Sequence, residues 1–272
     1  MNISIAIATY KRECDLKRLL DSIPDDDRIQ ICISNNASPD GTDELVKQYI
    51  KTRSGPIKYF KQETNLGANL NIINALSMCD NDYCLAMTDD DYFLTGSLDY
   101  VFNKIEETPN CCHFFSCINY YEIKKVAHSY HYLKADTPDL MAAKAMVRSH
   151  IYSGVLYTKN IIQKTLLEHG NIARKNLYVN LPFSAVAINE GQYVVHERPI
   201  LIHTWENEVY WGVEPSSKSV AKSHAEMISY IESEIITKRG VQKNIRKIMK
   251  FKRNIFIRIF SWLSWKLFWH LR

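Results

Sequence analysis

Three adjacent carboxylates, Asp89, Asp90 and Asp91, follow directly on the apolar run YCLAM. Neighbouring like charges repel one another, so they are tolerable only where water surrounds them or a cation neutralises them. Tyr92 and Phe93 come next, and a fully solvated turn has no need of such neighbours. Carboxylate oxygens suit Mg²⁺ or Mn²⁺, which leave positions open for phosphate oxygens. The triplet therefore predicts a divalent cation that bridges a diphosphate. The alternatives are a solvated acidic turn or a helix N-cap.

Other polar residues also stand where apolar runs end. Thr9, Tyr10 and Arg12 follow the run ISIAIA, and Asn35 follows the run IQICIS. His203 ends a later run, ILIH. A single histidine is more often structural, so we treat His203 as a second-rank candidate.

The elements that must position these residues alternate along the first hundred residues. Runs rich in β-branched or aromatic residues at 3–8, 29–34, 57–61 and 82–87 predict buried strands. Helical spacing of apolar residues and dense turn chemistry separate them. The alternation predicts right-handed βαβ units and a mostly parallel, Rossmann-like α/β sheet with flanking helices. Ligands bind such sheets beyond the carboxyl ends of the strands, so we expect the polar clusters to meet at one edge.

The second half of the chain is less regular. The segments CCHFFSCINYYEI and VAHSYHYL favour antiparallel strands. We expect helices near 138–147 and 159–168 and strands at 150–158, 192–197 and 200–205.

Charge is divided along the chain. The formal net charge is +4, yet the segment from Ile235 to Arg272 holds eleven Lys or Arg and no Asp or Glu, which leaves −7 on residues 1–234. Residues 244–272 combine cations with apolar residues, among them Ile245, Ile248 and Met249, at helical spacing.

This C-terminal tail predicts an amphipathic helix that lies on an anionic membrane surface. Its apolar part is interrupted and too short for the roughly 20 residues of a spanning helix. One alternative is a helix that docks on the acidic body of the protein. Nucleic acid is disfavoured as a partner, because the rest of the chain is acidic and shows no recognised binding module. The N-terminus, MNISIAIATY, shows no secretory leader, so we expect a cytoplasmic location.

Three stretches carry a family resemblance: ISIAIATYKR, ICISNNASPDGTDEL and YFKQETNLGANLNIINALSMCDNDYCLAMTDDD. They resemble successive blocks of a family 2 glycosyltransferase with the GT-A fold, in particular bacterial enzymes that assemble surface polysaccharide such as lipopolysaccharide or capsule. The resemblance covers roughly residues 1–110. It implies a nucleotide-diphosphate-sugar donor, a cation (Mg²⁺ or Mn²⁺) held by a DxD motif, and inverting transfer of one sugar to a glycan or lipid-linked acceptor.

The resemblance assigns residues to the donor nucleotide. Thr9, Tyr10 and Arg12 match the block that lines the base and ribose. Asn35 stands where the family usually has an Asp that contacts the pyrimidine base. An amide offers a donor and an acceptor where a carboxylate offers acceptors only, so base recognition differs here.

Asn65 and Gly67 match the block before the third helix. There glycine allows close backbone approach and the helix N-terminus favours phosphate, with a plain loop and cap as the alternative.

The acidic motif fits in two registers, Asp89-x-Asp91 or Thr88-Asp89-Asp90 followed by Asp91. The resemblance assigns Asp89 and Asp90 to the donor. It assigns Asp91, with Asp89 and His203, to the metal.

An inverting transfer needs a general base near the acceptor hydroxyl. No acidic residue lies between Glu168 and Glu190, where the family usually places its base. Glu190 is the nearest candidate, with a surface charge at a helix end as the alternative. Asp136 and Asp139 are fallbacks.

We therefore expect a nucleotide-sugar-binding half at 1–110, an acceptor-binding half of the same domain at 111–234, and a membrane-associating tail at 235–272. The expected protein is a glycosyltransferase, peripheral on the inner face of the cell membrane. A sugar-nucleotide pyrophosphorylase is one alternative, but IATYKREC lacks the Gly-rich phosphate loop expected there. A non-enzymatic membrane-surface adaptor is another.

Overall fold

A computed structural model describes residues 1–121, 126–129, 135–149, 151–205 and 217–250. Within these residues one nine-stranded sheet has the order β3-β2-β1-β4-β8-β6-β9-β5, and β7 pairs with β6. The strands are β1 (Ile3–Thr9), β2 (Ile29–Asn35), β3 (Ile57–Lys61), β4 (Tyr83–Thr88), β5 (Tyr92–Phe93), β6 (Cys112–Tyr121), β7 (Val126–Ser129), β8 (Val155–Thr158) and β9 (Tyr193–Trp205).

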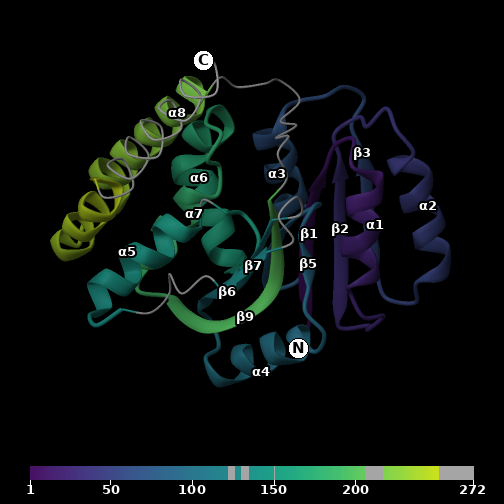
Figure 1. The fold of residues 1–272 in the computed structure, drawn as a ribbon, viewed down its shortest axis with the longest axis horizontal. Helices are drawn as coiled ribbons and strands as arrows, with labels where there is room; N and C mark the ends of the chain where they lie inside the picture. Colours follow the sequence, from purple (N-terminus) through teal and green to yellow (C-terminus); the bar gives the residue numbers. More distant parts are fainter. Residues whose placement is uncertain (122–125, 130–134, 150, 206–216, 251–272) are drawn as a thin grey trace, which may run out of the picture.

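Helices cover both faces of this sheet (Figure 1). They are α1 (Glu13–Asp21), α2 (Thr42–Thr52), α3 (Ala68–Ser77), α4 (Ser97–Glu107), α5 (Pro138–Arg148), α6 (Lys159–Lys175), α7 (Leu181–Glu190) and α8 (Ser217–Tyr230), followed by a π-helix (Ile231–Ile235) and a helical segment at 239–250.

The first half of the sheet is parallel. Strands β3, β2, β1 and β4 lie side by side in one direction, as the alternation of strand and helix predicts. Beyond β4 the sheet is mixed, because β8 is antiparallel to both of its neighbours while β6 and β9 are parallel. The predicted α/β architecture is confirmed, and the expected antiparallel pairing holds for β6 with β7.

Alternation along the strands builds two cores. Ile3, Ile5 and Ile7 of β1 face the layer formed by α1, α2 and α4. The opposite face of the sheet presents the smaller residues Ala6 and Ala86, and α3 and α5–α8 pack there. Large residues on one face and small ones on the other allow helices to approach both sides closely.

Strand β9 is longer than the sequence predicts. A proline normally ends a strand, so we expected two strands around Pro199. The structure has one curved strand (Figure 1), and the β6–β9 register shifts twice around Ser116, which pairs with Pro199. The irregularity accommodates the missing N–H and bends the strand. Strand β8 is shorter than predicted, since residues 151–154 form a turn in which Gly154 has φ +84°.

Part of the predicted tail belongs to the body. Val241 (1% exposed) and Ile245 (0% exposed) are buried, and Ile248 and Met249 pack against the same core. The prediction that Ile245 faces a membrane is therefore wrong, because the protein core covers it, and Ile248 and Met249 are partly covered by the same core. Residues 251–272 of the tail lie outside the described residues. In the described part of the chain, no helix is both long and apolar enough to cross a bilayer.

Two buried histidines join β6 to β9. His113 Nδ1 lies 2.9 Å from His196 Nε2, and His113 Nε2 lies 3.2 Å from the carbonyl oxygen of Thr108. Because that carbonyl can only accept, His113 donates from Nε2 and accepts from His196 at Nδ1. The His196 ring also stacks on Phe115 with centroids 4.6 Å apart. Burial lowers the pKa of both His113 and His196 to about 4.

This pair predicts a loss of stability in mild acid. The unfolded chain takes up protons below about pH 6.5, whereas the folded imidazoles stay neutral down to about pH 4. The contribution of this pair to stability is thus full above pH 6.5 and falls as the pH drops toward 4, by about 2–3 kcal/mol for each imidazole. Urea unfolding at pH 7 and 4.5 measures this fall. His196→Gln, whose amide can still donate to His113, is expected to show a smaller fall, and an identical fall in both proteins would contradict the assignment.

Candidate active site

Strand ends bring the polar clusters to one edge of the sheet. Thr9 at the end of β1 pairs with Asn35 at the end of β2, and β4 ends beside them at Thr88. Strand β9 reaches the same edge, since Tyr92 pairs with Ile202. Because these two strands are antiparallel, the same register places Asp91 opposite His203.

Asp91 is fully buried, accepts hydrogen bonds from His203, Thr204 and Thr88, and lies beside the Ser153 hydroxyl. His203 Nδ1 lies 2.9 Å and 3.1 Å from its two carboxylate oxygens. The Thr204 backbone N–H and the Thr88 hydroxyl donate to it at 3.0 Å and 2.9 Å. Burial opposes charge on both Asp91 and His203. Each nevertheless stabilises the charge of the other, so the pKa of Asp91 is lowered and that of His203 is raised.

Asp89 and Asp90 share a different cation. Arg12 Nη1 forms an ion pair with each of them, at 3.3 Å for Asp89. The Tyr10 backbone N–H also donates to Asp89, at 3.3 Å, and Arg18 donates to the Asp90 carbonyl at 3.0 Å. Burial raises the pKa of Asp89 to about 7, although the Arg12 charge acts in the opposite direction.

The triplet is neither a solvated turn nor a helix cap. Asp89 is 6% exposed and Asp91 is 0% exposed, and the next helix, α4, begins only at Ser97 after the backbone of Gly96. The chain neutralises its own carboxylates, with Arg12 on Asp89 and Asp90 and His203 on Asp91. We call these five side chains the acidic corner.

This arrangement separates two of the metal-ligand candidates, Asp91 and His203, from the third, Asp89. Among the described residues, no group of three or more His, Cys, Asp or Glu could hold a metal. Asp91 and His203 form a pair whose carboxylate and imidazole can both bind a divalent ion when the ion replaces the proton between them, and two protein ligands leave positions for diphosphate oxygens. The pair therefore fits an ion shared with a ligand. Asp89 is bonded to Arg12 and Tyr10 instead.

Asn35 holds its own loop together. Its side-chain oxygen accepts from the Ser38 N–H at 2.9 Å, and its amide nitrogen donates to the Tyr59 hydroxyl at 2.9 Å. Tyr59 in turn donates to Asp43 at 2.8 Å. Asn35 is 0% exposed. The structure thus places it at the predicted edge but directs its amide into the protein.

Asn65 and Gly67 meet the end of β2 through Asn36. Asn36 donates to the Asn65 side-chain oxygen at 2.8 Å and accepts from the Leu66 N–H at 2.8 Å. Gly67 has φ +88° immediately before α3, a conformation that favours glycine. The loop before α3 is therefore fixed to the edge where Thr9 and the acidic corner lie.

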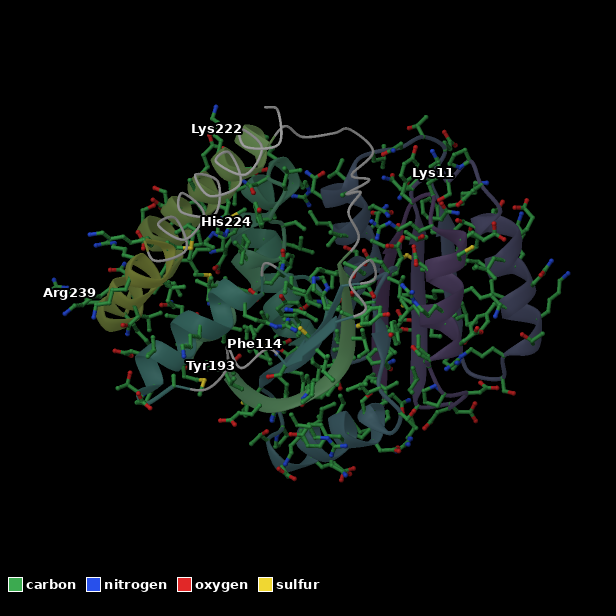
Figure 2. The ribbon with its side chains drawn as sticks, in the orientation of Figure 1. Lys11, Phe114, Tyr193, Lys222, His224 and Arg239 are labelled. Carbon is green, nitrogen blue, oxygen red and sulfur yellow. The ribbon has the colours of Figure 1, made fainter. Side chains whose placement is uncertain are left out.

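Two non-glycine residues with left-handed backbone flank this edge. Lys11 has φ +56° and Ala37 has φ +60°, and the Lys11 N–H donates to the Ser38 hydroxyl at 3.0 Å. Figure 2 shows Lys11 near the upper ends of the parallel strands. Strained backbone of this kind clusters at functional sites, which agrees with a binding role for the edge.

Comparison with known sequences identifies the family. The profile of "Glycosyl transferase family 2" matches residues 4–162, more than half of the chain. This chain belongs to glycosyl transferase family 2. The match confirms the family that the N-terminal blocks predict, and it extends beyond them into α6.

Two curated relatives match shorter segments. Abequosyltransferase RfbV from Salmonella typhimurium is 38% identical over 102 residues, which cover 36% of this chain and 31% of the relative. GalNAc(5)-diNAcBac-PP-undecaprenol beta-1,3-glucosyltransferase from Campylobacter jejuni is 30% identical over 108 residues, 39% of this chain and 35% of the relative. The matched segments thus span about a third of either relative.

Solved structures confirm the GT-A fold. TarS (1–349) from S. aureus superposes with a TM-score of 0.66 at 16% identity, covering 90% of this chain and 70% of TarS. The mannosyltransferase PcManGT from Pyrobaculum calidifontis superposes with a TM-score of 0.60 at 13% identity, covering 90% of this chain and 68% of PcManGT.

The structure does not bring the three candidate bases of this family 2 chain to the acidic corner. Glu190 ends α7 and pairs with Lys164 at 2.8 Å. It precedes the start of β9, whereas His203 lies near its end, roughly 30 Å along the strand at 3.3 Å per residue. The Asp139 carboxylate contacts Gly240, and Asp136 is exposed before α5. The ion pair with Lys164 and the position at the end of α7 favour the alternative of a surface charge at a helix end.

Sequence reasoning missed several residues that shape the family 2 site. Ser153, in the turn before β8, contacts both the backbone N–H and the hydroxyl of Thr88 at 2.9 Å. Arg18 supports the Asp90 backbone from α1. The Ser153 contact joins residues 65 positions apart, and no local pattern marks it. Arg18 was detectable only as a cation on the first helix.

Proposed function

We propose that this chain is an inverting, metal-dependent glycosyltransferase. It moves one sugar from a nucleotide-diphosphate donor to a glycan or lipid-linked acceptor in the assembly of bacterial surface polysaccharide. The observation that carries the proposal is the acidic corner, in which buried Asp91 meets His203 at the carboxyl edge of the parallel half of the sheet.

The residues of the edge have distinct roles in this proposal. Thr9, Tyr10 and the loop of Asn65 and Gly67 form the side that receives the nucleoside. Arg12, which holds Asp89 and Asp90 in the structure, is within reach of a diphosphate bound at the corner and offers it a positive charge. Asn35 acts on the base through the loop it fixes.

Asp91 and His203 would hold Mg²⁺ or Mn²⁺. Such an ion stabilises the negative charge that grows on a departing nucleoside diphosphate, an effect worth several kcal/mol. Asp91 is well suited to this role because it is already ionised and oriented by Thr88 and Thr204 before any ligand arrives. Preorganised groups need no rearrangement during the reaction.

The structural neighbours support a nucleotide-sugar donor. TarS has been crystallised in complex with UDP-GlcNAc, and PcManGT in complex with GDP-Man and Mn²⁺. Their ligands carry different bases, so the fold alone does not select the nucleotide of this chain.

The curated relatives support an acceptor in surface glycan assembly. One is named for abequose transfer, and the other for a GalNAc(5)-diNAcBac-PP-undecaprenol substrate, a lipid-linked glycan. A lipid-linked acceptor requires the enzyme to work at a membrane.

The C-terminal helices support attachment to the cytoplasmic face of that membrane. The segment 239–250 buries its apolar side and exposes basic side chains, namely Arg239, Lys243, Arg246, Lys247 and Lys250. In Figure 2, Arg239 of this segment and Lys222 of α8 project outward from the edge of the molecule. Exposed lysine and arginine attract anionic headgroups by about 1 kcal/mol each.

The two alternatives fit the observations less well. A pyrophosphorylase is expected to have a Gly-rich loop after β1, and that loop reads Tyr10-Lys11-Arg12 here. An adaptor has no use for a carboxylate that is fully buried against a histidine at a ligand-binding edge.

A thermal-shift screen tests the proposal. With Mn²⁺ present, one nucleoside diphosphate at 100 times its dissociation constant is expected to add about 2.7 kcal/mol of stability. For a chain of this size that corresponds to about 5–10 °C in melting temperature. Omission of Mn²⁺ is expected to remove most of the shift. No shift with any nucleoside diphosphate, and no release of nucleotide from any sugar donor, would favour the adaptor.

A further inference from the structure

Arg148, the last residue of α5, carries a buried charge. It is 2% exposed, and its Nη1 donates to the Ser153 carbonyl at 2.7 Å. Its Nε and Nη2 make no hydrogen bond to oxygen or nitrogen among the described residues, and the nearby Cys117 thiol is only a weak acceptor. A guanidinium remains ionised at physiological pH, and burying one without full pairing costs several kcal/mol. The retention of Arg148 at this position therefore calls for a role beyond packing.

Hydrogen bonds lead from Arg148 to the acidic corner through Ser153. The Thr88 N–H donates to the Ser153 hydroxyl at 2.9 Å, and the two hydroxyls lie 2.9 Å apart. The Thr88 hydroxyl donates its proton to Asp91 at 2.9 Å. The Ser153 hydroxyl must then donate to Thr88, because a hydroxyl has only one proton. The two hydroxyl donors thus point toward Asp91, while the Thr88 N–H donates back to Ser153 and holds the two residues together.

The turn that carries Ser153 is built around the guanidinium. Gly154 has φ +84°, its N–H donates to the Ala86 carbonyl at 3.1 Å, and its carbonyl accepts from the Phe115 N–H at 3.0 Å. A Cβ at Gly154 would lie 3.2 Å from Arg148 Nη2. The same Cβ would lie 2.9 Å from Leu201 Cδ2, and together with the positive φ this favours glycine in the turn that holds Ser153 between β4 and β6.

We propose that Arg148 is a positioning residue for Asp91. Through Ser153 and Thr88 it holds the Asp91 carboxylate toward His203, and so sets the affinity of this pair for a divalent cation. The inference rests on the proposed function, because it concerns the same corner.

Three variants and a matched control test the role of Arg148. Arg148→Met removes the charge but keeps a side chain of similar length. Arg148→Lys keeps the charge but loses the planar guanidinium. Ser153→Ala removes the hydroxyl that bonds to Thr88. Arg53→Met is the control, since the Arg53 side chain is also only 2% exposed but binds backbone carbonyls at the opposite edge of the sheet. Mn²⁺ binding to the full chain is measured by electron paramagnetic resonance, at a temperature where every variant is folded.

Loss of an outer-shell partner typically weakens metal sites by 10–100-fold. We expect Arg148→Met and Ser153→Ala to weaken Mn²⁺ binding, and to lower kcat for nucleotide release, by about tenfold or more, with Arg148→Lys intermediate. Arg53→Met is expected to lower only the melting temperature. If Arg148→Met does not fold, Arg148→Lys decides, and wild-type Mn²⁺ affinity in Arg148→Lys would then overturn the inference.

Two outcomes overturn the inference, and they are distinguishable. If the wild-type chain binds Mn²⁺ and releases nucleotide, but Arg148→Met and Ser153→Ala do so equally well, the inference fails and the proposed function stands. If the wild-type chain neither binds Mn²⁺ nor releases nucleotide, both fail.

Discussion

Asp91→Asn is expected to reduce donor turnover by about 100- to 1000-fold, the loss typical of removing one group that stabilises transition-state charge. Asparagine preserves size, can accept from the Thr204 N–H and can donate to neutral His203, so the fold is expected to survive. What it removes is the negative charge that a divalent ion and a protonated His203 both require. Release of nucleoside diphosphate from the donor found by thermal shift measures the effect.

Asp80→Asn is the matched control for this prediction. Asp80 lies before the same strand, β4, but at its opposite end, and it pairs with exposed Lys58 at 2.6 Å. Its replacement is expected to leave turnover at the wild-type level. If Asp91→Asn folds normally and keeps near wild-type turnover, Asp91 takes no part in the reaction.

Neutralising the exposed lysines of segment 239–250 is expected to release the protein from anionic membranes. Lys243, Lys247 and Lys250 are exposed, and at about 1 kcal/mol each their change to Gln predicts a loss of roughly 100-fold in vesicle affinity. Co-sedimentation with vesicles of phosphatidylglycerol and phosphatidylcholine measures it. Truncation after residue 250 is expected to weaken binding further, whereas a cut at 243 would also remove buried Ile245 and destabilise the core.

A second triple variant controls for net charge. Lys17, Lys51 and Lys58 are exposed on the half of the molecule that carries β1–β3, and their change to Gln removes the same three charges. This variant is expected to bind vesicles as the wild type does. Equal losses of vesicle affinity in the two triple variants would mean that binding depends on the overall charge of the protein and not on its C-terminal surface.

The parallel half of the fold was predictable because its signals are local. Each strand from β1 to β4 is a short apolar run closed by turn residues, and the register follows once helices alternate with strands. The meeting of Thr9, Asn35 and the Asp triplet at one edge followed from the same rule. Sequence patterns could not predict the single strand through Pro199, because a compensating shift in β6 accommodates the proline.

The chemistry of the site was only partly predictable. That Asp91 pairs with His203 depends on the β5–β9 register, which no local pattern encodes. The inward direction of Asn35 depends on Tyr59, and the ion pair of Glu190 with Lys164 joins residues 26 positions apart. Similarly, the apolar side of segment 239–250 resembles a membrane-binding surface in sequence. Its packing against the protein core is a tertiary contact that the sequence pattern does not reveal.

Anomalous scattering from crystals grown with Mn²⁺ and the selected nucleoside diphosphate tests the central claim most directly. We predict a manganese peak in contact with both Asp91 and His203, with the diphosphate of the nucleotide on its open side. An ordered nucleotide elsewhere on the molecule, with no manganese at this pair, would contradict the account.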